Sequence, residues 1–182
     1  GKLGKGLAIA GTAAATAVGT MVAKSVSSFA DHEQLTGGVD TLFKDSSAAV
    51  QKYANDAYKT AGLSANSYME TVTNFSASLI SSLKGDTAKA ADYANSALVD
   101  MADNANKMGT NMTDIQNAYQ GFAKQNYTML DNLKLGYGGT QAEMKRLLSD
   151  AQKLTGQKYD ISSFADITQA IHAIQTQMDI TG

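Results

Sequence analysis

Proline is absent from this chain, so glycine has to supply the helix ends. Glycine is less favourable than alanine inside a helix by roughly 1 kcal/mol, and it readily takes the left-handed conformation that ends one. The sequence is divided into segments of similar length by glycines near positions 38, 62, 85, 109, 136 and 156. The segments share no other residue signature, which argues against a true repeat. The spacing predicts short helices joined by glycine turns.

Within these segments, apolar residues recur every three or four positions, which is the period of one helix face. Strand patterns are nearly absent. The predicted helical stripes cover residues 50–61, 68–83, 90–108, 115–122, 144–154 and 164–178. The sequence therefore predicts an all-α fold, built as a bundle or array of short amphipathic helices. The last stripe is narrow enough for a coiled-coil seam, so self-association into a homo-oligomer is also expected.

Local residue types predict where the helices begin and end. Glycine is the favoured residue just after a helix, and Ser, Thr, Asp and Asn are favoured just before one. The expected ends are Gly62, Gly85, Gly109 and Gly156, and the expected starts are Ser64, Asp86, Thr113 or Asp114, and Ser162 or Ser163. A break between elements is expected at Thr36-Gly37-Gly38.

The composition excludes several classes of partner and site. The chain has no cysteine, so neither a disulfide framework nor a thiolate metal site can form. Residues 1–30 hold three lysines and no acid, whereas the remainder holds 12 basic and 17 acidic residues, a balance of −5. Binding to nucleic acid phosphates needs clustered basic side chains, and Arg146 is the only arginine. We therefore expect no specific nucleic-acid binding.

The first part of the chain differs from the rest. Residues 6–23 form an uncharged run of 18 residues, which could just span a bilayer as a helix at ~1.5 Å per residue. A stripe of small residues recurs every fourth position, at Gly11, Ala15, Gly19 and Ala23. It suits a membrane-entering or self-packing helix, although an alanine-rich lead-in is the more ordinary interpretation. We divide the chain into this lead-in, residues 1–34, and a helical core region, residues 35–182.

A glycine-rich corner separates two predicted helical patterns. The first carries Tyr127, Leu130 and Leu133, and the second begins after Gly136-Tyr137-Gly138-Gly139. Thr140, followed by Glu143, forms a capping box, in which the hydroxyl accepts from a free amide and the carboxylate reaches back. We expect a positive φ at Gly138 or Gly139, and we select the corner residues Gly136, Gly138, Gly139, Thr140 and Glu143 as a structural hinge and cap.

No group of residues predicts enzyme chemistry, a metal or a cofactor. His32-Glu33 lacks the second histidine of a zinc-protease helix. His172 follows Ile171 on the polar side of its helix, where we expect exposure to solvent. Asp100 and Asp103 share a helix turn and are interpreted as a solvated face. The glycine corner lacks the Lys-Ser/Thr of a phosphate loop, so the chain is predicted to be non-enzymatic.

One long string resembles a known family. The sequence NAYQGFAKQNYTMLDNLKLGYGGTQAEMKRLL, residues 117–148, is similar to the core region of tail tape measure proteins of long-tailed bacteriophages. Three further pieces, at residues 32–43, 53–83 and 103–127, resemble the same family in the same order. The resemblance extends from about residue 28 to the end of the chain, and none of its pieces is a catalytic motif.

The resemblance implies a structural role. Members lie in the tail tube interior in a few parallel copies, set tail length, and leave ahead of the DNA during ejection. The implied partners are the tail tube protein, tail-tip proteins, tail assembly chaperones and, at ejection, the host membrane. The implied locations are the host cytoplasm during assembly, the virion tail, and the host cell envelope on ejection. The alternative is a membrane-inserting or pore-forming helical module, which rests on residues 6–23 alone.

Overall fold

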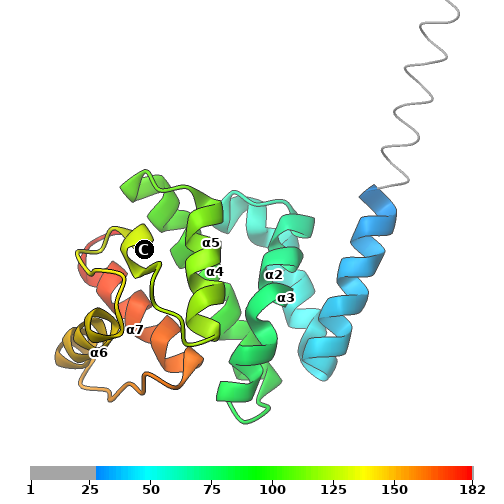
Figure 1. Ribbon diagram of the computed structural model, residues 1–182. Coiled ribbons are helices and arrows are strands. Elements are labelled where there is room, and N and C mark those ends of the chain that lie inside the picture. Colours follow the sequence, from blue (N-terminus) through cyan, green and yellow to red (C-terminus); the bar gives the residue numbers. More distant parts are fainter. Residues whose placement is uncertain (1–27, 182) are drawn as a thin grey trace, which may run out of the picture.

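The computed structural model describes residues 28–181, and every regular element in that range is a helix, as Figure 1 shows. The prediction of an all-α fold is confirmed. Elements follow one another as a helix over residues 28–43, η1 (Lys44–Ser46), α2 (Ser47–Ala61), α3 (Ala65–Ser82), α4 (Thr87–Met108), α5 (Met112–Ala123), η2 (Leu130–Leu133), α6 (Gln141–Thr155) and α7 (Phe164–Gln177).

The longest of these elements, α4, lies at the centre and packs against α2, α3, α5 and α7. Much of its buried face is alanine, at Ala90, Ala91, Ala94 and Ala97. Small side chains let neighbouring helix axes approach closely, and the larger Leu98 and Met101 then fill the space between those helices. The alanine stripe, which by itself buries modest area, therefore serves to bring four other helices together.

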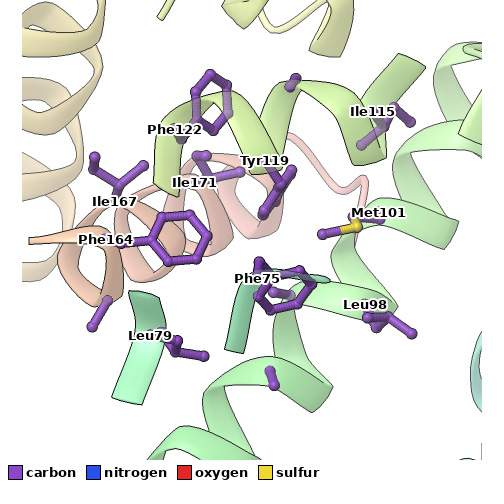
Figure 2. Close-up of a cluster of buried hydrophobic side chains, with 14 of the residues drawn as sticks. Phe75, Leu79, Leu98, Met101, Ile115, Tyr119, Phe122, Phe164, Ile167 and Ile171 are labelled. Carbon is purple, nitrogen blue, oxygen red and sulfur yellow. The ribbon is translucent and has the colours of Figure 1, made fainter. Parts of the chain in front are cut away.

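Two groups of helices flank α4. The helix of residues 28–43, α2 and α3 lie on one side, and α6 and α7 lie on the other (Figure 1). The groups meet in the cluster of Figure 2, where Phe75 of α3 contacts Phe164 of α7 edge to face, with ring centroids 5.9 Å apart. Tyr119 and Phe122 of α5 extend this aromatic contact, with centroids 5.7 Å apart. A continuous hydrophobic core therefore joins both groups.

Most of the predicted helix boundaries are confirmed. Three predicted N-caps accept a hydrogen bond from the backbone amide of the first turn, namely Ser64, Asp86 and Ser163. Four of the expected glycines take the left-handed conformation, with φ of 66° at Gly62, 88° at Gly85, 63° at Gly109 and 74° at Gly156. These signals depend on a few adjacent residues, which explains why the sequence sufficed to find them.

Two boundary predictions were wrong. Thr36-Gly37-Gly38 is not a break, because the helix of residues 28–43 runs through it and through the 34/35 division of the chain. Tertiary packing outweighs glycine's poor propensity there, since Val39 and Phe43 of that helix are fully buried. The start of α5 is Asn111, whose Oδ1 accepts from the amide of Thr113 at 2.8 Å, rather than Thr113 or Asp114.

The apolar seam considered for a coiled coil is occupied within the chain. Phe164, Ile167, Ile171 and Ile174 of α7 are all buried in the core. Figure 2 shows Phe164, Ile167 and Ile171 among side chains of α3, α4 and α5, and Ile174 is also buried, so this stripe is not an open surface for a second copy. Self-association through another surface stays a prediction. None of the helices in the described range is long and apolar enough to cross a bilayer.

Enlarging the alanine face of α4 should destabilise the fold. Ala94 is fully buried, so Ala94→Leu forces added methylenes between packed helices and should lower the free energy of unfolding by roughly 1–3 kcal/mol. Ala88→Leu is the matched control, because Ala88 is exposed on the same helix. Urea unfolding followed by circular dichroism measures both variants. Equal midpoints for the two would contradict the central packing of α4.

Candidate functional site

The glycine corner is a packed loop and not a turn between two long helices. The predicted helix through Tyr127 and Leu133 is wrong, since only the short η2 forms there. α5 stops because Gln125 takes a left-handed φ of 58°, while the amide of Asn126 returns to Gly121 O at 2.9 Å. An added Cβ at Gly121 would lie 3.0 Å from Asn126 O, so glycine permits this close return.

Left-handed residues occur in the corner, but not where they were predicted. Lys134 has φ of 53° and Gly136 has φ of 82°, whereas Gly138 and Gly139 do not have positive φ. The prediction of a positive φ at Gly138 or Gly139 is therefore wrong. Gly139 is required for a different reason, because an added Cβ would overlap the carbonyl oxygen of Thr128 and lie 2.9 Å from its carbon. The chain crosses itself here with no room for a side chain.

The cap at the start of α6 is present in a modified form. Thr140 Oγ1 accepts from the amide of Glu143 at 3.2 Å, as predicted. The carboxylate of Glu143, however, accepts from the amide of Gly138 at 3.1 Å, because the amide of Thr140 already donates to Gly138 O at 2.9 Å. The capping box therefore closes two residues further back than expected, and Glu143 holds the corner as well as the helix.

Arg146 also belongs to the corner, a role that was not predicted from the sequence. Its guanidinium lies over the ring of Tyr137, 4.2 Å from the centroid, and donates to Gly136 O at 2.7 Å and to Glu143. The hydrogen bond from Arg146 and that from the Gly138 amide lower the pKa of Glu143. The hydroxyl of Tyr137 donates to Asp150 Oδ2 at 3.1 Å. The signal in the sequence was the chain's single arginine, placed three residues after the capping glutamate.

A second cluster of polar side chains is buried between α4, α7 and the end of η2. Asn104 of α4 uses both protons of its amide, donating to Leu133 O at 2.9 Å and to Gln175 Oε1 of α7 at 2.7 Å. Its Oδ1 accepts from the hydroxyl of Thr110 at 2.8 Å. Gln175 Nε2 donates to the carbonyl of Asp100 at 3.2 Å. This network ties α4, α7 and the end of η2 to one another.

Because this network is buried, its hydrogen bonds favour one packing arrangement of α4, α7 and η2 over others. Asn104 and Gln175 are essentially inaccessible, so an unmade hydrogen bond would leave a polar group without water. The sequence contains a partial signal, because Asn104 continues the helical stripe of Ala97 and Met101 at the correct spacing. A polar residue on that face indicates a buried partner, although its identity cannot be found from one helix alone.

Asp100 lies in an environment other than the predicted one, and His172 is its partner. Asp100 was interpreted as part of a solvated face, but its side chain is 1% exposed, and this interpretation is wrong. His172 keeps 41% of its side chain exposed, yet its Nδ1 lies 2.9 Å from Asp100 Oδ1. The hydrogen bond to Asp100 raises the pKa of His172, whereas burial opposes this shift. A histidine on the polar edge of α7 thus reaches a carboxylate in the core.

The described residues offer hydrogen bonding and packing more than reactive groups. Residues 28–181 contain no group of three or more His, Cys, Asp or Glu side chains arranged to hold a metal ion. The hydroxyl of Tyr119 is fully buried without a hydrogen-bond partner, and burial raises its pKa well above the usual value. The predicted small-residue stripe of Gly11, Ala15, Gly19 and Ala23 lies outside the described residues.

The chain matches no family model, no curated protein and no solved structure in comparisons with known proteins.

Adding one methyl group should distinguish the two adjacent glycines of the corner. Gly139→Ala should lower the free energy of unfolding by roughly 1–3 kcal/mol, because the Cβ meets the backbone of Thr128, which cannot rotate away. Gly138→Ala is the matched control, since its Cβ would lie 3.5 Å from Glu143 Cγ, an ordinary contact. Thermal unfolding measures both. An unaltered melting temperature for Gly139→Ala would show that the chain does not cross itself at Thr128.

Removing the amide of Asn104 should destabilise the junction of α4 and α7. Asn104→Ala leaves Gln175 Oε1 and Leu133 O without their donor, which should lower the free energy of unfolding by about 1–3 kcal/mol. Asn106→Ala, on the exposed side of α4, should change it by less than about 0.5 kcal/mol. Equal effects of the two substitutions in chemical denaturation would contradict the buried network.

Proposed function

We propose that this chain is a folded, non-enzymatic segment of the tail tape measure protein of a long-tailed bacteriophage. The observation that carries the proposal is the resemblance of residues 117–148 and of three other pieces, which occur in one order along the chain. The longest string contains the residues that build the corner, including Gly139, Thr140 and Arg146. These residues have packing and capping roles, which suits a structural protein.

Within such a protein, we propose that residues 28–181 act as a folded unit and not as part of the ruler. A ruler segment adds ~1.5 Å of length for each helical residue when it runs straight. Here α4 is enclosed by α2, α3, α5 and α7, so the lengths of the helices do not add along one axis. The proposed role of the unit is in tail assembly and DNA ejection.

The proposed partners follow from the same family. They are the tail tube protein, the tail-tip proteins and the tail assembly chaperones, with the host membrane as a partner at ejection. The proposed location is the host cytoplasm during assembly, then the tail tube interior, and the host cell envelope on ejection. We propose no catalytic step and no cofactor for residues 28–181, in which Thr140 caps a helix and Asn104 belongs to the buried network.

Deleting α4 from the parent phage protein tests this proposal. Removal of Thr87–Met108 takes out the centre of the fold, so we expect loss of assembly or infectivity. If the stretch were ruler, its 22 residues would instead shorten the tail by roughly 33 Å in viable particles. Plaque assays and electron micrographs of the deletion phage separate the two outcomes.

A pair of point variants removes the ambiguity of a large deletion. Asn104→Ala perturbs the buried network without changing the length of the chain, and Asn106→Ala is its exposed control. We expect Asn104→Ala to reduce infectivity at elevated temperature, with tails of normal length where they form. Infectious deletion particles with shortened tails, or no tail phenotype for any of the variants, would overturn the proposal.

A further inference from the structure

The carboxylate of Asp100 is buried with one hydrogen-bonding side chain. Both oxygens face Nδ1 of His172, at 2.9 Å and 3.1 Å, and the side chain of Asp100 is 1% exposed. A buried carboxylate is unfavourable unless an opposite charge or several donors compensate it. Asp100 belongs to α4 and His172 to α7, so the compensating charge comes from a different helix. The protonation state of His172 therefore affects how strongly α4 and α7 hold together.

α7 attaches α6 to the rest of the molecule. It packs on α4, α3 and α5 and also on α6. α6 packs mainly on α7 and lies at the edge of the molecule in Figure 1. Any loosening of α7 from α4 thus also frees α6, although the apolar side chains of α7, such as Ile167 and Ile171, continue to favour attachment.

We propose that the Asp100–His172 pair makes the attachment of α7 to α4 sensitive to pH, so that α7 and α6 loosen together as His172 loses its proton. Protonated His172 gives the buried carboxylate both a hydrogen bond and a positive charge. Neutral His172 can still donate from Nδ1, but it leaves the negative charge of Asp100 uncompensated in the core. This pair adds a pH-dependent contact to the fold, independent of the proposed phage function.

Within residues 28–181, the elements packed on this pair contribute the following ionisable groups. From α5, the phenol of Tyr119 has its pKa raised mainly by burial and then by the nearby charge of Asp100, and it forms no hydrogen bond. α3 meets α7 through the uncharged Phe75 and the hydroxyl of Ser82, which accepts from the amide of Ala165. α4 also carries Asp103, one turn beyond Asp100.

Several charged groups on the remaining neighbouring elements have other partners. On α6, Arg146, Asp150 and Lys153 pair with one another or with Glu143. The carboxylate of Asp166 in α7 accepts a hydrogen bond from the backbone amide of Asp160, which lies in the loop before the helix, at 2.8 Å. The hydrogen bond and charge of Asp100 are accordingly the causes that raise the pKa of His172.

The direction of the pH dependence follows from proton binding. The folded state holds the proton on His172 more tightly than the unfolded state does, because the pKa of His172 is raised. Stability from the pair is then fully present below about pH 6.5, the unfolded value, and is lost as the pH rises through the folded pKa. The attachment of α7 should therefore weaken toward mildly alkaline pH.

Hydrogen exchange and imidazole titration together test the proposal. In the intact chain, exchange of α7 and α6 amides, corrected for the intrinsic effect of pH, should rise severalfold from pH 6 to pH 8.5 relative to α2. NMR titration should place the midpoint of His172 above the ordinary histidine value. Asp100→Asn should lower that midpoint and remove the pH-dependent exchange, because no buried negative charge remains.

Two histidine variants provide the controls. His172→Gln keeps a neutral donor and should give α7 exchange that no longer responds to pH beyond the response of α2. His32→Gln alters the only other histidine, which bonds to Asn66, and should keep the wild-type response. If His172→Gln folds poorly, the comparison of Asp100→Asn with wild type decides. A wild-type response that persists in either Asp100→Asn or His172→Gln, or an unshifted midpoint of His172, would overturn the proposal.

Discussion

Close packing against the small-residue face of α4 is the interaction on which the rest of the structure depends. Alanines at positions 90, 91, 94 and 97 let the surrounding helices approach a common axis. Larger side chains then supply the buried area, and the cluster of Figure 2 brings together Phe75, Tyr119 and Phe164 from three different elements. A chain low in aromatic residues, at 7%, can form a dense core in this way because its few large side chains converge.

In the C-terminal half of α4, the buried face includes polar side chains that form hydrogen bonds. Asn104 and Asp100 continue the buried face, and each has a partner on α7. Buried polar pairs add little net stability compared with apolar residues, but an alternative packing that leaves them unpaired is strongly disfavoured. The network therefore favours one register of α7 on α4. The corner acts in a similar way, because Gly139 permits the close approach to Thr128 and Arg146 donates a hydrogen bond to Gly136 O, which together favour one path of the chain between η2 and α6.

The sequence predicts local features of this fold better than long-range ones. Helix ends at Gly62 and Gly109 and starts at Ser64 and Asp86 follow from the conformational preferences of single residues, and these were found. The predicted break at Thr36-Gly37-Gly38 was wrong because the packing of Val39 and Phe43 keeps that stretch helical. The surroundings of Asp100 could not be predicted, because its partner lies 72 residues away on another helix. In the corner, the Thr140 cap could be predicted from adjacent residues. The close approach of Gly139 to Thr128 could not, because it depends on the path of a loop.

Native-state hydrogen exchange of the whole chain is the measurement that tests this account most directly. Amides exchange slowest where exposing them requires the whole fold to open. If the fold is organised around α4, the middle of that helix should exchange slowest of all and should open only with global unfolding. The solvent-exposed residues 28–34 should exchange much faster. Amides of α4 that exchange as fast as those of residues 28–34, or well before those of α2 and α7, would contradict the central role of α4.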